Sequence, residues 1–207
     1  MHPINYFNRW FSQPIVVTDY AVVGIITALN QHSMAQDATA QDYVMPLRRC
    51  CEKSGRFRVL GENQDTFYCF VYADDEQKLD PPIYFETCLD LAIDYGFDTA
   101  DIIDGDHVLV CSTFTPFLWQ ILGRHVCIRL ESGNQFTGGV SGIIWKEAIA
   151  LDSAFTNPMG KDFPAGYICF FSEDTVCIPD WGAAFLHDEA RRLFIEQYKP
   201  VIHQSWD

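Results

Sequence analysis

The chain has 207 residues, 48% of them apolar, enough to bury a core in one large domain or two very small ones. Fourteen lysines and arginines stand against twenty-eight aspartates and glutamates, so the formal net charge at pH 7 is −14. This charge repels nucleic-acid phosphates and anionic membrane surfaces, which excludes both as expected direct partners and favours a basic protein partner. We expect a single domain over residues 1–207.

The N-terminal region predicts mature sequence followed by a buried helix. Residues 1–17 have neither the basic flank nor the continuous apolar stretch of a secretory signal, so we expect a cytoplasmic protein. The most apolar window, Ile15–Leu29, is interrupted by Asp19 and is too short to span a bilayer. Its helical spacing instead predicts a helix that is capped at Thr18 or Asp19, runs to about His32 and packs on a sheet.

The next part of the chain predicts a helix followed by strands. We expect the helix over about Ala40–Ser54, kinked at Pro46 and ended by Gly55. After it, apolar residues alternate and predict two strands around a turn at Gly61–Asp65, with inward positions Phe57, Val59, Phe67, Cys69 and Val71. A third strand is expected at Ile83–Phe85, which the two preceding prolines place at an edge or an entry position.

Strands and helices continue to alternate to the end of the chain, without regular βαβ spacing. This favours an α+β fold with a twisted, mixed or antiparallel sheet flanked by helices. A long turn at Gly133–Gly142 is the candidate boundary between two halves. The remaining expected elements are a strand at His107–Cys111, a helix capped by Ser112 or Thr113 and reaching Leu122, a helix near Ile144–Ala150, strands at Gly166–Phe171 and Thr175–Ile178 that turn at Ser172–Asp174, and a final helix at His187–Tyr198.

Residues that would carry catalysis or bind a metal show no recognisable pattern. The eight cysteines are expected to be reduced rather than paired in four disulfides, and no Cys-x-x-Cys or His-x-x-x-His spacing predicts zinc. Asp101–Asp106 is the densest run of oxygen ligands, but it lacks EF-hand spacing, so a metal-dependent hydrolase is a less favoured alternative. No local pattern selects Cys111 with His107 or His125, and G-x-S-x-G and P-loop motifs are absent. We expect no enzyme, no metal and no cofactor.

Acidic residues are concentrated between positions 61 and 123, where thirteen of the twenty-eight occur against one lysine, Lys78. A solvated, solubilising loop would explain this, and so would a surface that complements a basic cleft. If residues 88–98 are helical, Asp90, Asp94 and Asp98 share one face. Aromatic residues in this stretch are either anchors for a partner or part of the core. The predicted partner-binding residues are Asp74, Asp75, Glu76, Asp80, Tyr84, Glu86, Asp90, Asp94, Tyr95, Asp98, Asp101, Asp104 and Asp106.

Short motifs between residues 44 and 122 resemble the SUKH superfamily. They occur in the family's order: the helix motif Pro46–Gly55 with Cys50 and Cys51 in place of aromatics, the Glu62-Asn63-Gln64 turn, the strand Phe67–Tyr72, the segment Asp80–Tyr84 with Ile83 in place of valine, and Ser112–Leu118. The resemblance implies a SUKH-like fold and an immunity protein that neutralises a cognate bacterial toxin, with a cationic nuclease domain as the expected target. It also implies an alternative, a regulatory scaffold like the superfamily's fungal cell-wall regulators.

Overall fold

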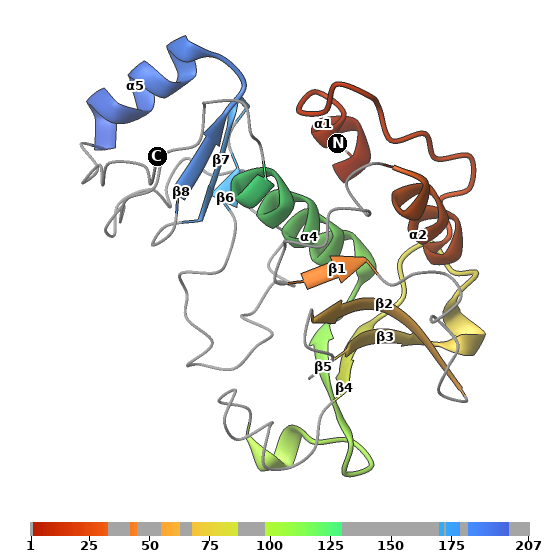
Figure 1. Ribbon diagram of the computed structural model, residues 1–207. Coiled ribbons are helices and arrows are strands. Elements are labelled where there is room, and N and C mark those ends of the chain that lie inside the picture. The colour runs from red at the N-terminus through yellow and green to blue at the C-terminus, as the bar shows by residue number, and fades with distance from the viewer. Residues whose placement is uncertain are drawn as a thin grey trace. The chain divides into compact units, whose positions relative to one another are not determined.

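A computed structural model of the chain describes residues 2–32, 42–44, 55–62, 68–86, 98–129, 170–171, 173–178 and 182–198 (Figure 1). The chain divides into two compact units, and each is described by itself. The sheet unit comprises Gln13–Phe117 and Ala154–Phe163, and the terminal unit comprises Met1–Ser12, Leu118–Ser153 and Pro164–Asp207. Helices and antiparallel sheets occur in the described residues, so the predicted α+β class is confirmed. The single-domain and SUKH-like assignments stay predictions.

The sheet unit contains five antiparallel strands that follow one another in both sequence and space. The strands are β1 (Asp42–Val44), β2 (Arg56–Glu62), β3 (Tyr68–Tyr72), β4 (Ile83–Glu86) and β5 (His107–Cys111). The strands predicted around residues 57–59, 67–71, 83–85 and 107–111 are therefore confirmed where the structure describes them. Because β4 lies between β3 and β5, the prolines that precede it mark an entry to the sheet and not an edge.

The predicted helix over Ala40–Ser54 is wrong at its described residues, because Asp42–Val44 forms strand β1. Tyr43 and Val44 favour extended backbone, and pairing with residues 60–62 of β2 decides their conformation. A short segment with few apolar residues carries too little periodic signal to distinguish the two structures. The rest of the predicted helix, residues 45–54, lies outside the described residues.

One face of the five-stranded sheet forms the apolar core of this unit. Two register shifts interrupt the alternation: one lies between Arg58 and Leu60 in β2, the other between Ile83 and Tyr84 in β4 where it pairs with β5. At the first shift Val59 and Leu60 are both buried, as expected where a bulge sets two residues against one. The buried side chains of this face include Val44, Phe57, Val59, Leu60, Cys69, Val71, Ile83, Phe85, Val108, Val110 and Cys111.

Helix α2 (Val22–Gln31) contacts the edge strand β1 and buries Val22, Ile25, Ile26, Ala28 and Leu29. The predicted cap at Thr18 or Asp19 is wrong, because the cap position is Ala21 and no side chain caps it. The backbone N–H groups of Val22 and Val23 instead donate to the carbonyls of Lys78 and Glu76, just after the 3₁₀ helix η3 (Ala73–Asp75). Carbonyl groups of a loop that is distant in the sequence thus accept hydrogen bonds from the first N–H groups of the helix. A search for a local capping residue could not have predicted this.

Helix α4 (Phe114–Arg129) follows β5 and continues past Leu122, where its prediction ended. The terminal unit holds α1 (Pro3–Phe7), an antiparallel sheet of β6 (Phe170–Phe171), β7 (Thr175–Ile178) and β8 (Gly182–Phe185), and α5 (Asp188–Tyr198). The predicted strand pair is confirmed for its described residues, and so is the final helix, whose first turn is capped by His187 Nδ1 accepting from Ala190 N–H at 3.1 Å. Helix α1 and β8 were not predicted.

The N-terminal segment is tied to the β6–β7 turn within the terminal unit. The Arg9 guanidinium donates to the Glu173 carbonyl at 2.6 Å and pairs with Asp174 at 2.7 Å. The Tyr6 ring packs against Trp119 at 5.0 Å, and its hydroxyl donates to the Thr175 carbonyl at 3.4 Å. These contacts join the first residues of the chain to its last third.

Several expectations concern residues outside the described ranges: the turn at Gly133–Gly142, the helix near Ile144–Ala150, and residues 166–169 of the first predicted C-terminal strand. In the described ranges, no helix has both the length and the apolar character needed to cross a bilayer.

Candidate functional site

The second face of the five-stranded sheet carries mainly charged and aromatic side chains, and Leu109 is its one aliphatic member among the described strand residues. We call it the charged–aromatic face; the strand registers place on it Arg56 and Arg58 of β2, Tyr68, Phe70 and Tyr72 of β3, Tyr84 and Glu86 of β4, and His107 and Leu109 of β5. It arises because each strand alternates these residues with core residues at a period of two.

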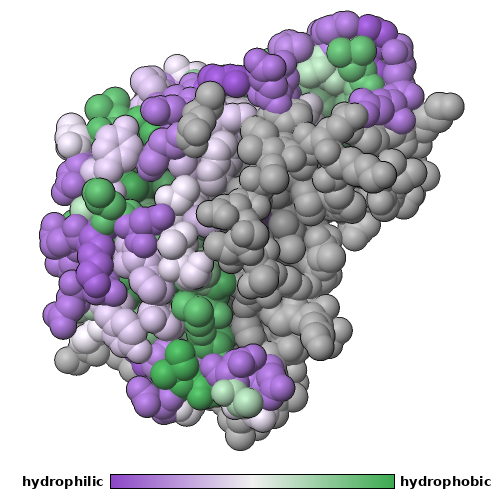
Figure 2. All heavy atoms as spheres, turned by 180° about the vertical axis from the view of Figure 1, so that it is seen from behind, coloured by the Kyte–Doolittle hydropathy of each residue, from purple (hydrophilic) through white to green (hydrophobic). Residues whose placement is uncertain are grey.

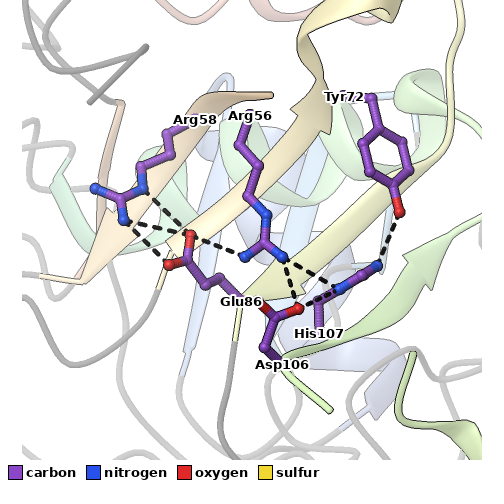
Figure 3. A network of polar contacts seen from close by, with 6 residues as sticks. All are labelled: Arg56, Arg58, Tyr72, Glu86, Asp106 and His107. Atoms are coloured by element: carbon purple, nitrogen blue, oxygen red, sulfur yellow. Dashed lines mark hydrogen bonds and ion pairs between the residues drawn. The ribbon is translucent and has the colours of Figure 1, made fainter. Parts of the chain in front are cut away.

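Two arginines are buried on this face and share one carboxylate (Figure 3). Arg56 is 8% exposed and Arg58 is 9% exposed. The Glu86 carboxylate accepts from Arg58 Nη2 at 3.1 Å and lies 3.5 Å from Arg56 Nη1. A buried guanidinium without a counter-ion would be costly, so Glu86 is what makes the burial of both arginines tolerable.

A second chain of polar contacts runs from Asp106 through His107 to Tyr72 (Figure 3). Asp106 Oδ1 lies 2.6 Å from Arg56 Nη2 and 2.7 Å from His107 Nδ1, and His107 Nε2 lies 2.9 Å from the Tyr72 hydroxyl. The short contact with the carboxylate makes Nδ1 the donor in the neutral ring, so Nε2 accepts from Tyr72. His107 is 1% exposed and is thereby fixed in tautomer and orientation. Chemically, this chain could pass a proton between Tyr72 and Asp106.

The contact between Arg56 and His107 shows that the sheet is strongly curved toward this face. The two residues lie on β2 and β5, which are separated by β3 and β4. The registers place His107 level with Tyr68 and Arg56 level with Tyr72, so in a flat sheet the two residues would be about 20 Å apart, three inter-strand spacings across and four residues along. That is farther than the two side chains reach together, yet Arg56 Nη2 is 3.3 Å from His107 Nδ1. The charged–aromatic face is therefore concave, and long side chains from its two sides meet across it.

Aromatic rings line this concave face beneath the charges. The Arg56 guanidinium lies 4.4 Å from the centre of the Phe70 ring, and that of Arg58 lies 3.9 Å from the Tyr68 ring. Phe70 also stacks on Tyr84 with ring centres 5.5 Å apart. Burial raises the pKa of Tyr84, and Tyr72 and Asp75 add to this effect. Tyr84 is therefore half-buried in the sheet face and is not an isolated surface anchor.

Four of the predicted partner-binding acids take part in local structure. Glu86 and Asp106 belong to the ion-pair network, as described above. Asp80 Oδ1 accepts from the Thr115 backbone N–H at 2.6 Å and so caps the first turn of α4. Asp98 is extended and accepts from Ala100 N–H at 2.9 Å, which caps the 3₁₀ helix η4 (Thr99–Asp101). A helix through residue 98 is therefore wrong at that residue.

The other predicted acids differ in their surroundings. Asp75 pairs with Lys78 at 2.6 Å, and Glu76 is half-buried. Asp74, Asp101 and Asp104 are exposed, and within the described ranges no ion pair involves them. Asp90, Asp94 and Tyr95 lie outside the described residues. The structure thus gathers Tyr84, Glu86 and Asp106 on the sheet face and leaves Asp74, Asp101 and Asp104 open to solvent.

Four residues of the network were missed by the sequence analysis: Arg56, Arg58, Tyr72 and His107. The sequence signal that could have identified them is the two-residue repeat of a strand, because each of them alternates with a core residue of its own strand. Reading both faces of each strand would have put Arg56 and Arg58 beside Tyr84 and Glu86. The approach of β5 to β2 has no sequence signal.

Cys111 allows a pH-dependence to be predicted. Burial, with the nearby charge of Asp80, raises the pKa of its thiol from 9.0 to about 12. Below pH 9 the thiol is neutral in both states, while above it only the unfolded chain loses the proton, so stability falls. Between pH 9.5 and 10.5 we expect the free energy of unfolding to fall by up to ~1.4 kcal/mol more than in Cys111→Ala, measured by urea denaturation. If the free energy of unfolding fell equally with pH in the wild type and in Cys111→Ala, this prediction would be wrong.

The described side chains form no group of three or more His, Cys, Asp and Glu that could hold a metal ion. Comparisons of the chain with protein-family models, curated proteins and solved structures give no match.

Proposed function

We propose that this chain is a cytoplasmic immunity protein, not an enzyme, which binds and neutralises a basic bacterial toxin domain through its acidic surface. The observation that supports this is the solvent exposure of acidic residues between positions 79 and 123, a stretch with no lysine or arginine. Asp98, Asp101 and Asp104 are exposed there, and no described cation pairs with them. Their charge remains available to a partner.

The charged–aromatic face is consistent with the same proposal, because its own charges cancel. Its two arginines are matched by Glu86 and Asp106, so its positive and negative side chains neutralise each other. Among the described acids of the sheet unit that have no described ion pair, Asp74, Asp101 and Asp104 lie at η3, η4 and the turn before β5 and are exposed. A cationic nuclease domain, whose cleft binds phosphates, would be attracted to such a surface and would associate quickly at low salt.

We expect a gene for a basic toxin domain to lie beside this chain's gene, and the test is co-expression of the chain with that protein. We expect the chain to restore growth to cells that produce that protein, and the purified pair to form a complex with one copy of each. We also expect the association rate constant to fall steeply as salt is raised, because exposed charges are screened.

An unrelated acidic protein of similar size and net charge serves as the control. Equal protection by this control would mean that charge alone acts and that no specific neutralisation occurs. The proposal also fails if the chain and its basic neighbour do not associate at low salt.

A further inference from the structure

Within the described residues, the outer edge of strand β5 has no partner strand beyond the pairing of His107 with Ile103. This strand is the last of the sheet and pairs on one side with β4. On the other side, Ile103 N–H donates to the His107 carbonyl at 2.7 Å, and His107 N–H donates to the Ile103 carbonyl at 3.3 Å. The polar backbone groups of His107 thus point away from β4, and those of Leu109, two residues later, point the same way. No described residue pairs with Leu109 on that side.

Two apolar side chains are exposed along this edge. Ile103 is 37% exposed and Leu109 is 47% exposed. Ile103 lies opposite His107, and Leu109 follows His107 at the period of a strand, so both side chains project from the same face as diagonal neighbours. In Figure 1 this segment is at the bottom of the view, and at the bottom of Figure 2 hydrophobic and hydrophilic residues lie side by side.

Two exposed acidic residues, Asp101 and Asp104, lie close to Ile103 in the sequence. Asp101 ends η4, and Asp104 stands in the turn between Ile103 and His107. Asp104 and Gly105 have positive φ values of 51° and 74°, which fix the tight turn and hold the Asp104 carboxylate on its outside. The charge complement of this edge is a segment that carries lysine or arginine beside an apolar residue.

We propose that a basic, extended segment of the toxin docks on the outer edge of β5 and adds a strand to the sheet beside Leu109. Backbone hydrogen bonds to Leu109 set its direction, an apolar residue covers Ile103 and Leu109, and cationic side chains lie beside Asp101 and Asp104. This inference rests on the proposed function and names its contact site. Because the open edge is short, the side chains carry a large share of the affinity.

The experiment measures the dissociation constant of the basic neighbouring protein for two variants at this edge and two matched controls. Leu109→Lys is compared with Leu79→Lys, whose parent residue is 67% exposed in another loop. Asp101→Lys is compared with Asp188→Lys, the same charge change at an exposed acid in the first turn of α5, outside the proposed binding surface. We expect each edge variant to weaken binding by about tenfold or more, and each control by less than about threefold. Amide hydrogen exchange should show protection of Leu109 N–H in the wild-type complex.

The outcomes separate the two proposals. If the wild-type chain neutralises the toxin but the edge variants bind as their controls do, the docking site is wrong and the immunity function stands. Weakened binding without protection of the Leu109 amide would rule out strand addition. If the wild-type chain neither binds nor protects, both proposals fail. Thermal unfolding of each variant reports folding, and if Leu109→Lys does not fold, Asp101→Lys and amide exchange decide.

Discussion

Glu86→Gln is expected to lower the free energy of unfolding by about 3–5 kcal/mol, because it leaves two buried guanidinium groups without their shared carboxylate. Arg58 exchanges the carboxylate that accepts its contacts at 3.1 and 3.3 Å for an uncharged amide with one acceptor oxygen, while Arg56 keeps Asp106. Glutamine has nearly the same shape, so the loss measures charge and not packing. Urea denaturation at pH 7 gives the difference directly.

The matched control for this change is Asp75→Asn, which breaks the pair of Asp75 with Lys78 at the surface. We expect a cost below about 1 kcal/mol, as is usual when one partner is well exposed. If Glu86→Gln costs no more than Asp75→Asn, the two arginines do not depend on Glu86. A further loss of stability in the double variant Glu86→Gln with Arg56→Met would show that the charge of Arg56 is satisfied elsewhere.

Gly24→Ala is expected to destabilise the chain, although alanine favours helices more than glycine does. An added Cβ at Gly24 would overlap the carbonyl oxygen of Asp19 and lie 2.7 Å from Asp19 Cβ. Relieving this overlap requires backbone movement at the start of α2, at about 1–3 kcal/mol, against about 1 kcal/mol gained from helix propensity. We expect a net loss of up to about 2 kcal/mol, measured by thermal and urea unfolding.

The control for this change is Gln31→Ala at the exposed end of the same helix, where the added propensity acts without a clash. We expect Gln31→Ala to leave stability within about 0.5 kcal/mol of wild type. A Gly24→Ala protein at least as stable as wild type would mean that the segment before α2 can move away from the helix at no cost.

The ion-pair network and the β5 edge have separate roles in this account. The network uses Glu86 and Asp106 to hold β2, β4 and β5 together on the concave face. The edge uses Asp101 and Asp104, whose replacement breaks no described ion pair. Changes at Glu86 are therefore expected to alter stability, and changes at Asp101 to alter binding.

The sequence by itself determined most of the strands and helices in the described residues, but not β1, β8 or α1. Alternation of Phe57 and Val59, or of Cys69 and Val71, predicts strands because one side of each strand is buried whatever its neighbours are. The same local logic predicted α5. It failed at Asp42–Val44, where pairing with β2 decides the backbone, and at the start of α2, where carbonyls of residues 76 and 78 replace a local cap.

Only the tertiary structure decided which charges are available. By sequence, Glu86, Asp106, Asp101 and Asp104 are equivalent members of one acidic stretch. Curvature of the sheet brings Arg56 of β2 to Asp106 beside β5, so part of that stretch is neutralised inside the protein while Asp101 and Asp104 stay in solvent. The physical reason is that the number of charged residues can be counted in the sequence, whereas the formation of an ion pair depends on the distance between two side chains. Here those side chains come from strands that are far apart in the chain.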